Sequence, residues 1–212
     1  MRLTKLAHAA LVLEESGKKL IVDPGVFTAD PIDAAGAVAI VVTHEHGDHW
    51  TSDQLTAVLK QAPGIPIFAP EGVAAAATGF DITVVTEGEE ITVGPFTLKF
   101  FGEKHAVIHE SVPTVDNVGV LINDTLYYPG DSYTVPEGVS VDVLAAPVGA
   151  PWLKIGEAID FVLAVAPKRV FATHDMTLSD AGRGMGSERL GWAAEQGGGE
   201  FLELTPGDSV EL

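Results

Sequence analysis

The chain contains no cysteine among its 212 residues. This absence excludes disulfides, thiolate metal sites and cysteine nucleophiles, so any bound metal must be held by imidazole and carboxylate groups. Basic residues are also few, since 12 lysines and arginines stand against 30 aspartates and glutamates and give a net charge of −18. Such a surface repels phosphate backbones and anionic lipid. We therefore expect neither nucleic acid nor a membrane as a partner.

Long apolar runs are missing as well. Charged residues interrupt residues 1–20, which are too few for a signal peptide or a membrane span, and we expect a cytoplasmic protein. Hydrophobic residues nevertheless make up 46% of the chain. This length and composition suffice for one well-buried core, so we predict a single domain over residues 1–212. The oligomeric state stays open, a homo-oligomer included.

The spacing of apolar residues predicts an alternation of strands and helices. We expect strands over 3–13, 18–23, 37–43, 65–69, 82–85, 90–93, 97–101, 118–122, 125–128, 141–145, 169–173 and 200–204, and helices over 53–61, 71–78, 155–166 and 187–196. The three strands between 82 and 101 resemble an antiparallel meander. The order of elements favours an α/β protein, namely a four-layer αββα sandwich with mixed sheets inside and helices on the outer faces.

The densest chemical signal is the segment THEHGDHW at residues 43–50. His44, His46, Asp48 and His49 fall there directly after a predicted buried strand, and they are ligand types that zinc and related ions accept. The bland alternative is a polar loop whose histidines cap the following helix. Three further candidate ligands also follow predicted strands: His105, Asp131 and His174. Polar residues gathered at strand ends are typical of an α/β active site.

HEHGDH resembles the H-x-H-x-D-H signature of the metallo-β-lactamase superfamily. The later candidate ligands are similar to those of this superfamily in order and approximate spacing, and the likeness covers essentially the whole chain. Residues 6–25, LAHAALVLEESGKKLIVDPG, resemble the opening of the branch that contains ascorbate-phosphate lactonase and the N-acyl-phosphatidylethanolamine phospholipase. The resemblance implies the fold strongly and the substrate hardly at all.

The resemblance also implies two divalent metal ions, with zinc favoured and manganese or iron as alternatives. By its pattern, the first ion is held by His44, His46 and His105, the second by Asp48, His49 and His174, and Asp131 bridges both. His109, four residues after His105, is the alternative third ligand of the first site. His105 is favoured because it lies closer to the end of its strand.

Asp48 and His8 are the candidates for a direct catalytic role. His8 is either an ordinary core histidine within an early strand or a group that hydrogen-bonds a leaving group or orients a ligand. Asp23 either forms a turn or fixes the tautomer of a metal-bound histidine. Trp50 and Tyr133 either line the pocket or, as we favour, pack in the core.

Three glycines lie in the segment DAGRGMGSE, at positions 182, 184 and 186. They form no Walker or dinucleotide motif. We predict a flexible loop beside the site, in which Arg183 could contact an anionic substrate.

These observations predict a metal-dependent hydrolase that uses a metal-bridging hydroxide on a small ester-like substrate, such as a lactone or a phosphodiester. A small molecule is thus the expected partner. Two alternatives stay open, because a fold does not decide its chemistry. They are an iron-dependent oxidoreductase on the same fold and a non-catalytic protein that binds a metal or a ligand.

Overall fold

The structure is a computed structural model that describes residues 1–29 and 31–212. Its strands form two seven-stranded sheets. The first has the order β14 (Ser209–Glu211), β1 (Arg2–Lys5), β2 (Leu11–Glu15), β3 (Lys18–Val22), β4 (Ala37–Val41), β5 (Ile67–Ala69), β6 (Ile82–Val84). The second has the order β13 (Glu200–Phe201), β12 (Arg169–Thr173), β11 (Val143–Pro147), β10 (Leu126–Tyr128), β9 (Gly119–Ile122), β8 (Phe96–Phe101), β7 (Glu90–Val93).

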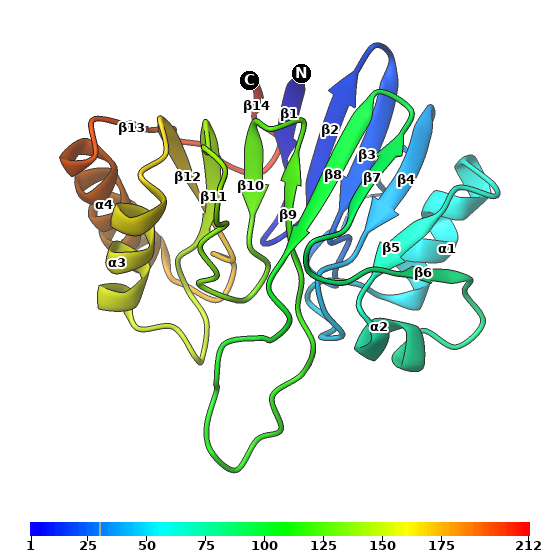
Figure 1. Cartoon of the computed structure of the whole chain (residues 1–212), viewed down its shortest axis with the longest axis horizontal. Coiled ribbons are helices and arrows are strands. Elements are labelled where there is room, and N and C mark those ends of the chain that lie inside the picture. Colours follow the sequence, from blue (N-terminus) through cyan, green and yellow to red (C-terminus); the bar gives the residue numbers. More distant parts are fainter. Residues whose placement is uncertain (30) are drawn as a thin grey trace.

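Two helices cover the outer face of each sheet, as Figure 1 shows. Helices α1 (Ser52–Gln61) and α2 (Glu71–Ala76) pack on the first sheet, and α3 (Ile155–Val165) and α4 (Asp180–Gln196) pack on the second. The predicted four-layer αββα sandwich is therefore confirmed. None of the helices in the described residues is long and apolar enough to cross a membrane.

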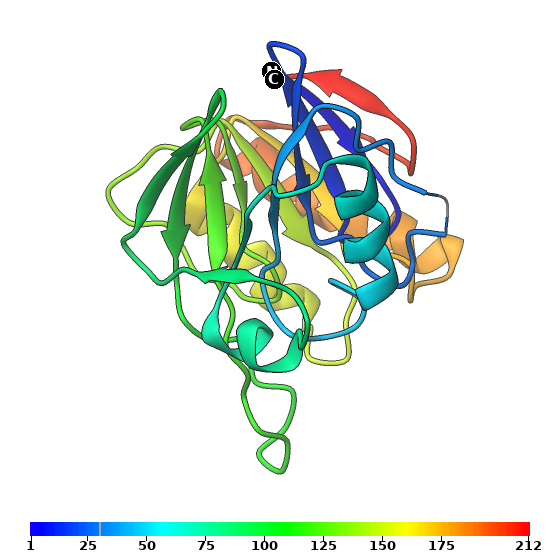
Figure 2. The same cartoon turned by 90° about the vertical axis from the view of Figure 1, so that its right-hand side faces the viewer.

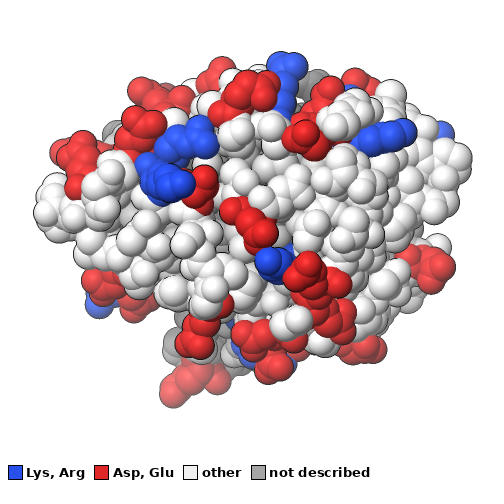
Figure 3. All heavy atoms as spheres, turned by 45° about the horizontal axis from the view of Figure 1, so that its top comes forward, with Lys and Arg blue, Asp and Glu red and all other residues white. Residues whose placement is uncertain are grey.

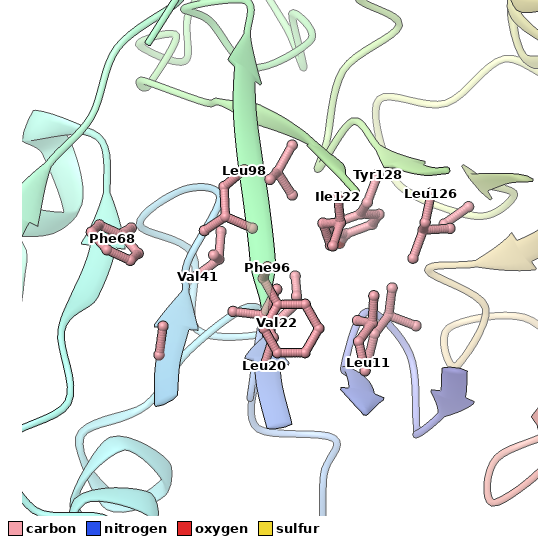
Figure 4. Packing of buried hydrophobic residues seen from close by; sticks show 14 of the residues in the cluster. Leu11, Leu20, Val22, Val41, Phe68, Phe96, Leu98, Ile122, Leu126 and Tyr128 are labelled. Carbon is pink, nitrogen blue, oxygen red and sulfur yellow. The ribbon is translucent and has the colours of Figure 1, made fainter. Parts of the chain in front are cut away.

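The main core lies between the two sheets. Alternate side chains of each strand point inward, because successive residues of a strand face opposite sides of its sheet. In Figure 4, Leu20 and Val41 of the first sheet face Leu98 and Ile122 of the second, and all four are fully buried. Pressing the sheets together in this way fixes the strand ends, from which the site loops emerge.

Two strand predictions are wrong. The strand predicted over 3–13 is broken at residues 6–10, where Leu6 donates to the carbonyl of Ala10 and His8 adopts a positive φ of 62°. The predicted meander also fails, because β6 pairs in parallel with β5 in the first sheet, while β7 pairs with β8 in the second. The strands predicted over 118–122 and 125–128 pair as an antiparallel hairpin, in which Asn123 and Asp124 of the turn both have positive φ.

The glycine-rich segment is helical, so the predicted flexible loop is wrong. Ser179 caps α4 by accepting a hydrogen bond from the backbone of Gly182, and the helix runs from Asp180. A side chain at Gly186 would approach Val148 to 2.4 Å, so this glycine lets α4 pack closely on the loop after β11. Arg183 pairs with Asp180 on the same helix instead of reaching toward the site.

Acidic side chains are spread over most of the face shown in Figure 3, with basic ones between them. This surface agrees with the net charge of −18. The absence of nucleic-acid and membrane partners stays a prediction.

Candidate metal centre

The seven predicted ligands lie together on loops that follow strands of both sheets. The possible ligand atoms of His44, His46 and His105 lie within 4.8 Å of one another and form a first group. Asp48, His49 and His174 form a second group under the same limit, joined by His8. A third group, His44, His49 and Asp131, joins the first two. The predicted ligands therefore lie together, with His8 as an addition, and their division between two ions stays a prediction.

Asp131 lies between the two groups and is almost fully buried. Its Oδ2 atom is 3.3 Å from Nε2 of His105 and 3.1 Å from Nε2 of His174. Its Oδ1 atom is 3.2 Å from Nε2 of His49. One carboxylate thus faces histidines of both groups, as a bridging ligand would.

Hydrogen bonds fix the tautomer of three of these histidines. Nδ1 of His49 donates to Oδ2 of Asp23 at 2.6 Å. Nδ1 of His105 donates to the carbonyl of Ala106 at 2.5 Å, and Nδ1 of His174 donates to the carbonyl of Gly149 at 2.6 Å. Because these oxygens can only accept, each Nδ1 carries a proton, so Nε2 is the nitrogen that offers a lone pair to a cation when the ring is neutral.

These Nε2 atoms supply the test of whether a cation fits. Within the described residues, Nε2 of His49, His105 and His174 and Oδ1 of Asp131 are buried without a hydrogen-bond partner. Burying a polar atom without a hydrogen-bond partner costs folding free energy. Several such atoms close together therefore indicate that an ion or a water binds between them. Imidazole nitrogen and carboxylate oxygen suit zinc and related divalent ions. The residues present therefore fit a divalent cation.

Of the two predicted roles of Asp23, the structure supports the one that fixes the tautomer of a histidine, here His49. It is fully buried, and besides His49 its carboxylate accepts hydrogen bonds from the Thr43 backbone and hydroxyl and from the Tyr128 hydroxyl. Asp23 thereby joins the end of β3 to the start of the histidine loop and to β10 of the other sheet.

Two supporting residues escaped the sequence analysis. Trp152 donates from Nε1 to Oδ2 of Asp131 at 2.9 Å, and Asn117 accepts at Oδ1 from the backbone of Asp131 at 3.0 Å. Asn117 also lies close to Gly130. A Cβ on Gly130 would lie 2.4 Å from Oδ1 of Asn117, so position 130 has no space for a side chain. Neither residue has a sequence signal, because each contacts Asp131 from a separate loop.

Other candidates lie where packing or solvent explains them. His109 is exposed and bonds Ser111 on its own loop, away from the first group, which holds His105. Trp50 is buried against α1 and donates to the Glu45 carbonyl. Tyr133 packs edge-on against Trp152, consistent with the favoured packing role.

The electrostatics differ between the candidate ligands. Burial alone would lower the pKa of His49 and His174, but Asp131 outweighs burial and raises the pKa of both, so these rings must release a proton before Nε2 can bind a cation. Burial, followed by the neighbouring His49, lowers the pKa of His44 well below its usual value, which keeps its ring neutral. Burial alone would raise the pKa of Asp131, but the neighbouring rings of His49, His105 and His174 outweigh burial and lower that pKa well below its usual value. Neutral imidazole and ionised carboxylate are the forms that coordinate metals.

The family follows from the comparison with known proteins. The model of the beta-lactamase superfamily domain matches residues 2–174. The chain belongs to this superfamily. Among its relatives, protein Rv0786c of Mycobacterium tuberculosis is 36% identical over 195 residues, which cover 90% of this chain and 91% of that protein. A UPF0173 metal-dependent hydrolase of Carboxydothermus hydrogenoformans is 26% identical, over 82% of this chain and 84% of its own.

The same fold occurs in a solved structure with a different chemistry. CmlA, a diiron beta-hydroxylase from Streptomyces venezuelae, superposes with a TM-score of 0.78 at 16% identity, over 100% of this chain and 54% of that chain. Two relatives are named metal-dependent hydrolases, which is the enzyme class predicted from the sequence for this member of the superfamily. The fold alone does not separate hydrolysis from oxidation.

Proposed function

We propose that this superfamily member is a hydrolase that holds two divalent metal ions, zinc first, and cleaves a small ester-like substrate. The carrying observation is the set of buried donor atoms without a hydrogen-bond partner, which come from both groups of histidines and from the Asp131 carboxylate between them. In this proposal His44, His46 and His105 hold one ion, Asp48, His49 and His174 hold the other, and Asp131 bridges them. The resemblance to the lactonase-like branch stays a prediction.

Two bound divalent cations would supply a water acidified toward hydroxide near neutral pH and would offset the oxyanion charge of an ester under attack. The side chains of the chain provide the rest. Asp131 is 4% exposed at its side chain, whereas Asp48 is 27% exposed. We therefore assign to Asp48, the more accessible carboxylate, the orientation of an attacking water. Burial raises its pKa, but His174 and His8 outweigh burial and lower it far below the usual value, so Asp48 stays ionised and accepts a hydrogen bond instead of keeping the proton.

His8 receives a different role from the direct catalytic one, which is one of the two alternatives that its sequence position leaves open. Its side chain is fully buried, so it does not reach a substrate. Burial lowers its pKa and keeps the ring neutral, and its Nδ1 accepts a hydrogen bond from the Met176 backbone at 3.2 Å. The ring proton must then lie on Nε2, which donates to Oδ2 of Asp48 at 3.2 Å. We propose that His8 positions Asp48 and is not itself a ligand.

Nitrogen NMR of zinc-loaded protein tests this role of His8. We expect Nε2 of His8 to keep its attached proton, while Nε2 of His49 and His174 shows the shift of a metal-bound nitrogen. The tautomer of His8 differs from that of the other two because its Nδ1 accepts where theirs donate. A metal-bound Nε2 at His8 would show that it is a fourth ligand of the second group.

Metal removal and restoration test the proposed function as a whole. The protein should bind two zinc ions per chain by elemental analysis, lose hydrolysis of an ester and phosphodiester panel on chelation, and regain it when zinc returns. The fold likeness to a diiron hydroxylase makes oxidation the rival, so the panel should also be run without oxygen. Less than one ion per loaded chain, or activity that needs iron and oxygen, would reject the hydrolase proposal.

A further inference from the structure

Three loops that carry or contact candidate ligands also carry exposed apolar side chains. Val107 and Ile108, just after His105, are 66% and 36% exposed, and Val112 on the same loop is 42% exposed. Val26 is 62% exposed and Met176, two residues after His174, is 37% exposed. Exposed apolar surface beside a candidate site is typical of a place where a ligand or partner binds.

The backbone of each of these loops is bonded directly to the site. The N–H of Ala106, next to Val107, donates to the carbonyl of Asp131 at 2.8 Å. The N–H of Val26 donates to the carbonyl of Gly47 at 2.9 Å, in the histidine loop. The N–H of Met176 donates to Nδ1 of His8 at 3.2 Å. Apolar groups from three separate loops are thus anchored within one hydrogen bond of the centre.

The largest of these loops, residues 102–118, joins β8 to β9 and projects from the lower end of the sandwich in Figures 1 and 2. Its base is fixed, because the N–H of His105 donates to Val115 and Lys104 pairs with Asp116 at 2.5 Å. Long loops in compact proteins are commonly functional when they are not linkers. His105 of this loop belongs to the first group. The loop therefore carries Val107, Ile108 and Val112 on the same segment as a candidate ligand.

Positive charge is scarce on the same loops. In the stretches 42–51, 102–118, 129–142, 148–154 and 174–179, all of them described, the lysines and arginines are Lys104 and Lys154. The ammonium group of Lys104 is already paired with Asp116. A phosphate-bearing substrate would therefore meet carboxylates and apolar groups beyond the metal ions themselves. A neutral substrate with an apolar part suits these surroundings better.

We propose that the apolar rim, defined as Val26, Val107, Ile108, Val112 and Met176, binds the apolar part of an uncharged carbonyl ester or lactone, in preference to a phosphodiester. The inference rests on the proposed hydrolase function and narrows its substrate class. The rim contributes by removing the apolar part of the substrate from water, at about fourfold in binding for each fully buried methylene group.

The test uses zinc-loaded protein and p-nitrophenyl acetate, butyrate and hexanoate, with bis(p-nitrophenyl) phosphate as the charged comparison. We expect kcat/KM to rise at least about tenfold from acetate to hexanoate, and the phosphodiester to be slower than any ester. In a double variant, Val107→Ser with Ile108→Ser, the rise with chain length should collapse. Val84→Ser is the matched control, because Val84 is 38% exposed on β6, outside the site loops, and should keep the rise.

Three results would overturn the inference while leaving the hydrolase proposal in place. They are a kcat/KM that does not depend on chain length, a phosphodiester cleaved faster than the esters, and a dimer that the double variant dissociates while the chain-length dependence persists. The last result would identify the rim as an interface between copies. Failure of the loaded protein to hydrolyse any panel member would instead reject the proposed function itself.

Discussion

Asp131→Asn should abolish most metal binding at the position between the two groups of ligands. It should also lower kcat/KM for ester hydrolysis by a factor on the order of 10³, because several kcal/mol of charge stabilisation depend on a bridged pair of cations. The carboxylate oxygens face Nε2 of His49, His105 and His174 at 3.1–3.3 Å. Asparagine keeps the size of the side chain but removes its negative charge and one acceptor. Elemental analysis and steady-state kinetics on the same samples measure both effects.

Asp124→Asn is the matched control for this variant. Asp124 is an exposed carboxylate in the hairpin between β9 and β10, and its removal costs the same unit of charge. It should retain metal content and activity, with circular dichroism confirming that both variants fold. Full metal content together with unchanged hydrolysis in Asp131→Asn would contradict the bridging role.

Gly25→Ala should displace the histidine loop and weaken both the fold and metal binding. A Cβ at this position would lie 1.7 Å from the backbone oxygen of Asp48 and 2.7 Å from the backbone nitrogen of His49. These are main-chain atoms, so they cannot turn aside as the end of a side chain can. Overpacking of this kind costs about 1–3 kcal/mol, and here it falls on two candidate ligands. Urea unfolding and metal titration report the two losses separately.

The same loop offers a close control in Gly47→Ala. A Cβ on Gly47 meets no heavy atom within 4 Å among the described residues, and Gly47 is adjacent in sequence to Asp48. This variant should unfold at nearly the same urea concentration as the natural chain and bind metal equally well. Equal behaviour of the two alanine variants would show that the close approach of Gly25 to the histidine loop is not needed.

Much of the fold follows from local pattern. Strand β12 is predicted over its full length, because Arg169–Thr173 is a short apolar run bounded by Pro167 and His174. Helix α1 is recognisable from its cap at Thr51 and its end near Gln61. Such signals depend on neighbours in the sequence, which is why they suffice.

Strand pairing and backbone exceptions are harder to predict. The segment of β6 carries no local sign that it joins β5 rather than β7, because that choice depends on which sheet edge is free. Positive φ at His8 was equally hidden, since histidine is not a residue that requires this conformation. The glycines of α4 lower its helix propensity, yet the close contact with Val148 overrides that preference.

The candidate site divides in the same way. The ligand candidates were predictable, because four of them lie in one motif and the others follow strand ends. The residues that hold them were mostly not. Trp152 and Asn117 bond Asp131 across loops that are distant in sequence, and a hydrogen bond of this kind leaves no mark on spacing.

The site draws on both sheets, since His44 follows β4 of the first and His174 follows β12 of the second. Metal ions bound by residues of both sheets would link two layers that otherwise pack through apolar contacts. They would act as a cross-link in a chain that has no cysteine to form a disulfide. A link between His44 and His174 closes a long loop of the chain, and this lowers the conformational entropy of the unfolded state. Resistance to heat should therefore track the free zinc concentration, and metal scarcity would leave the protein both inactive and easier to degrade.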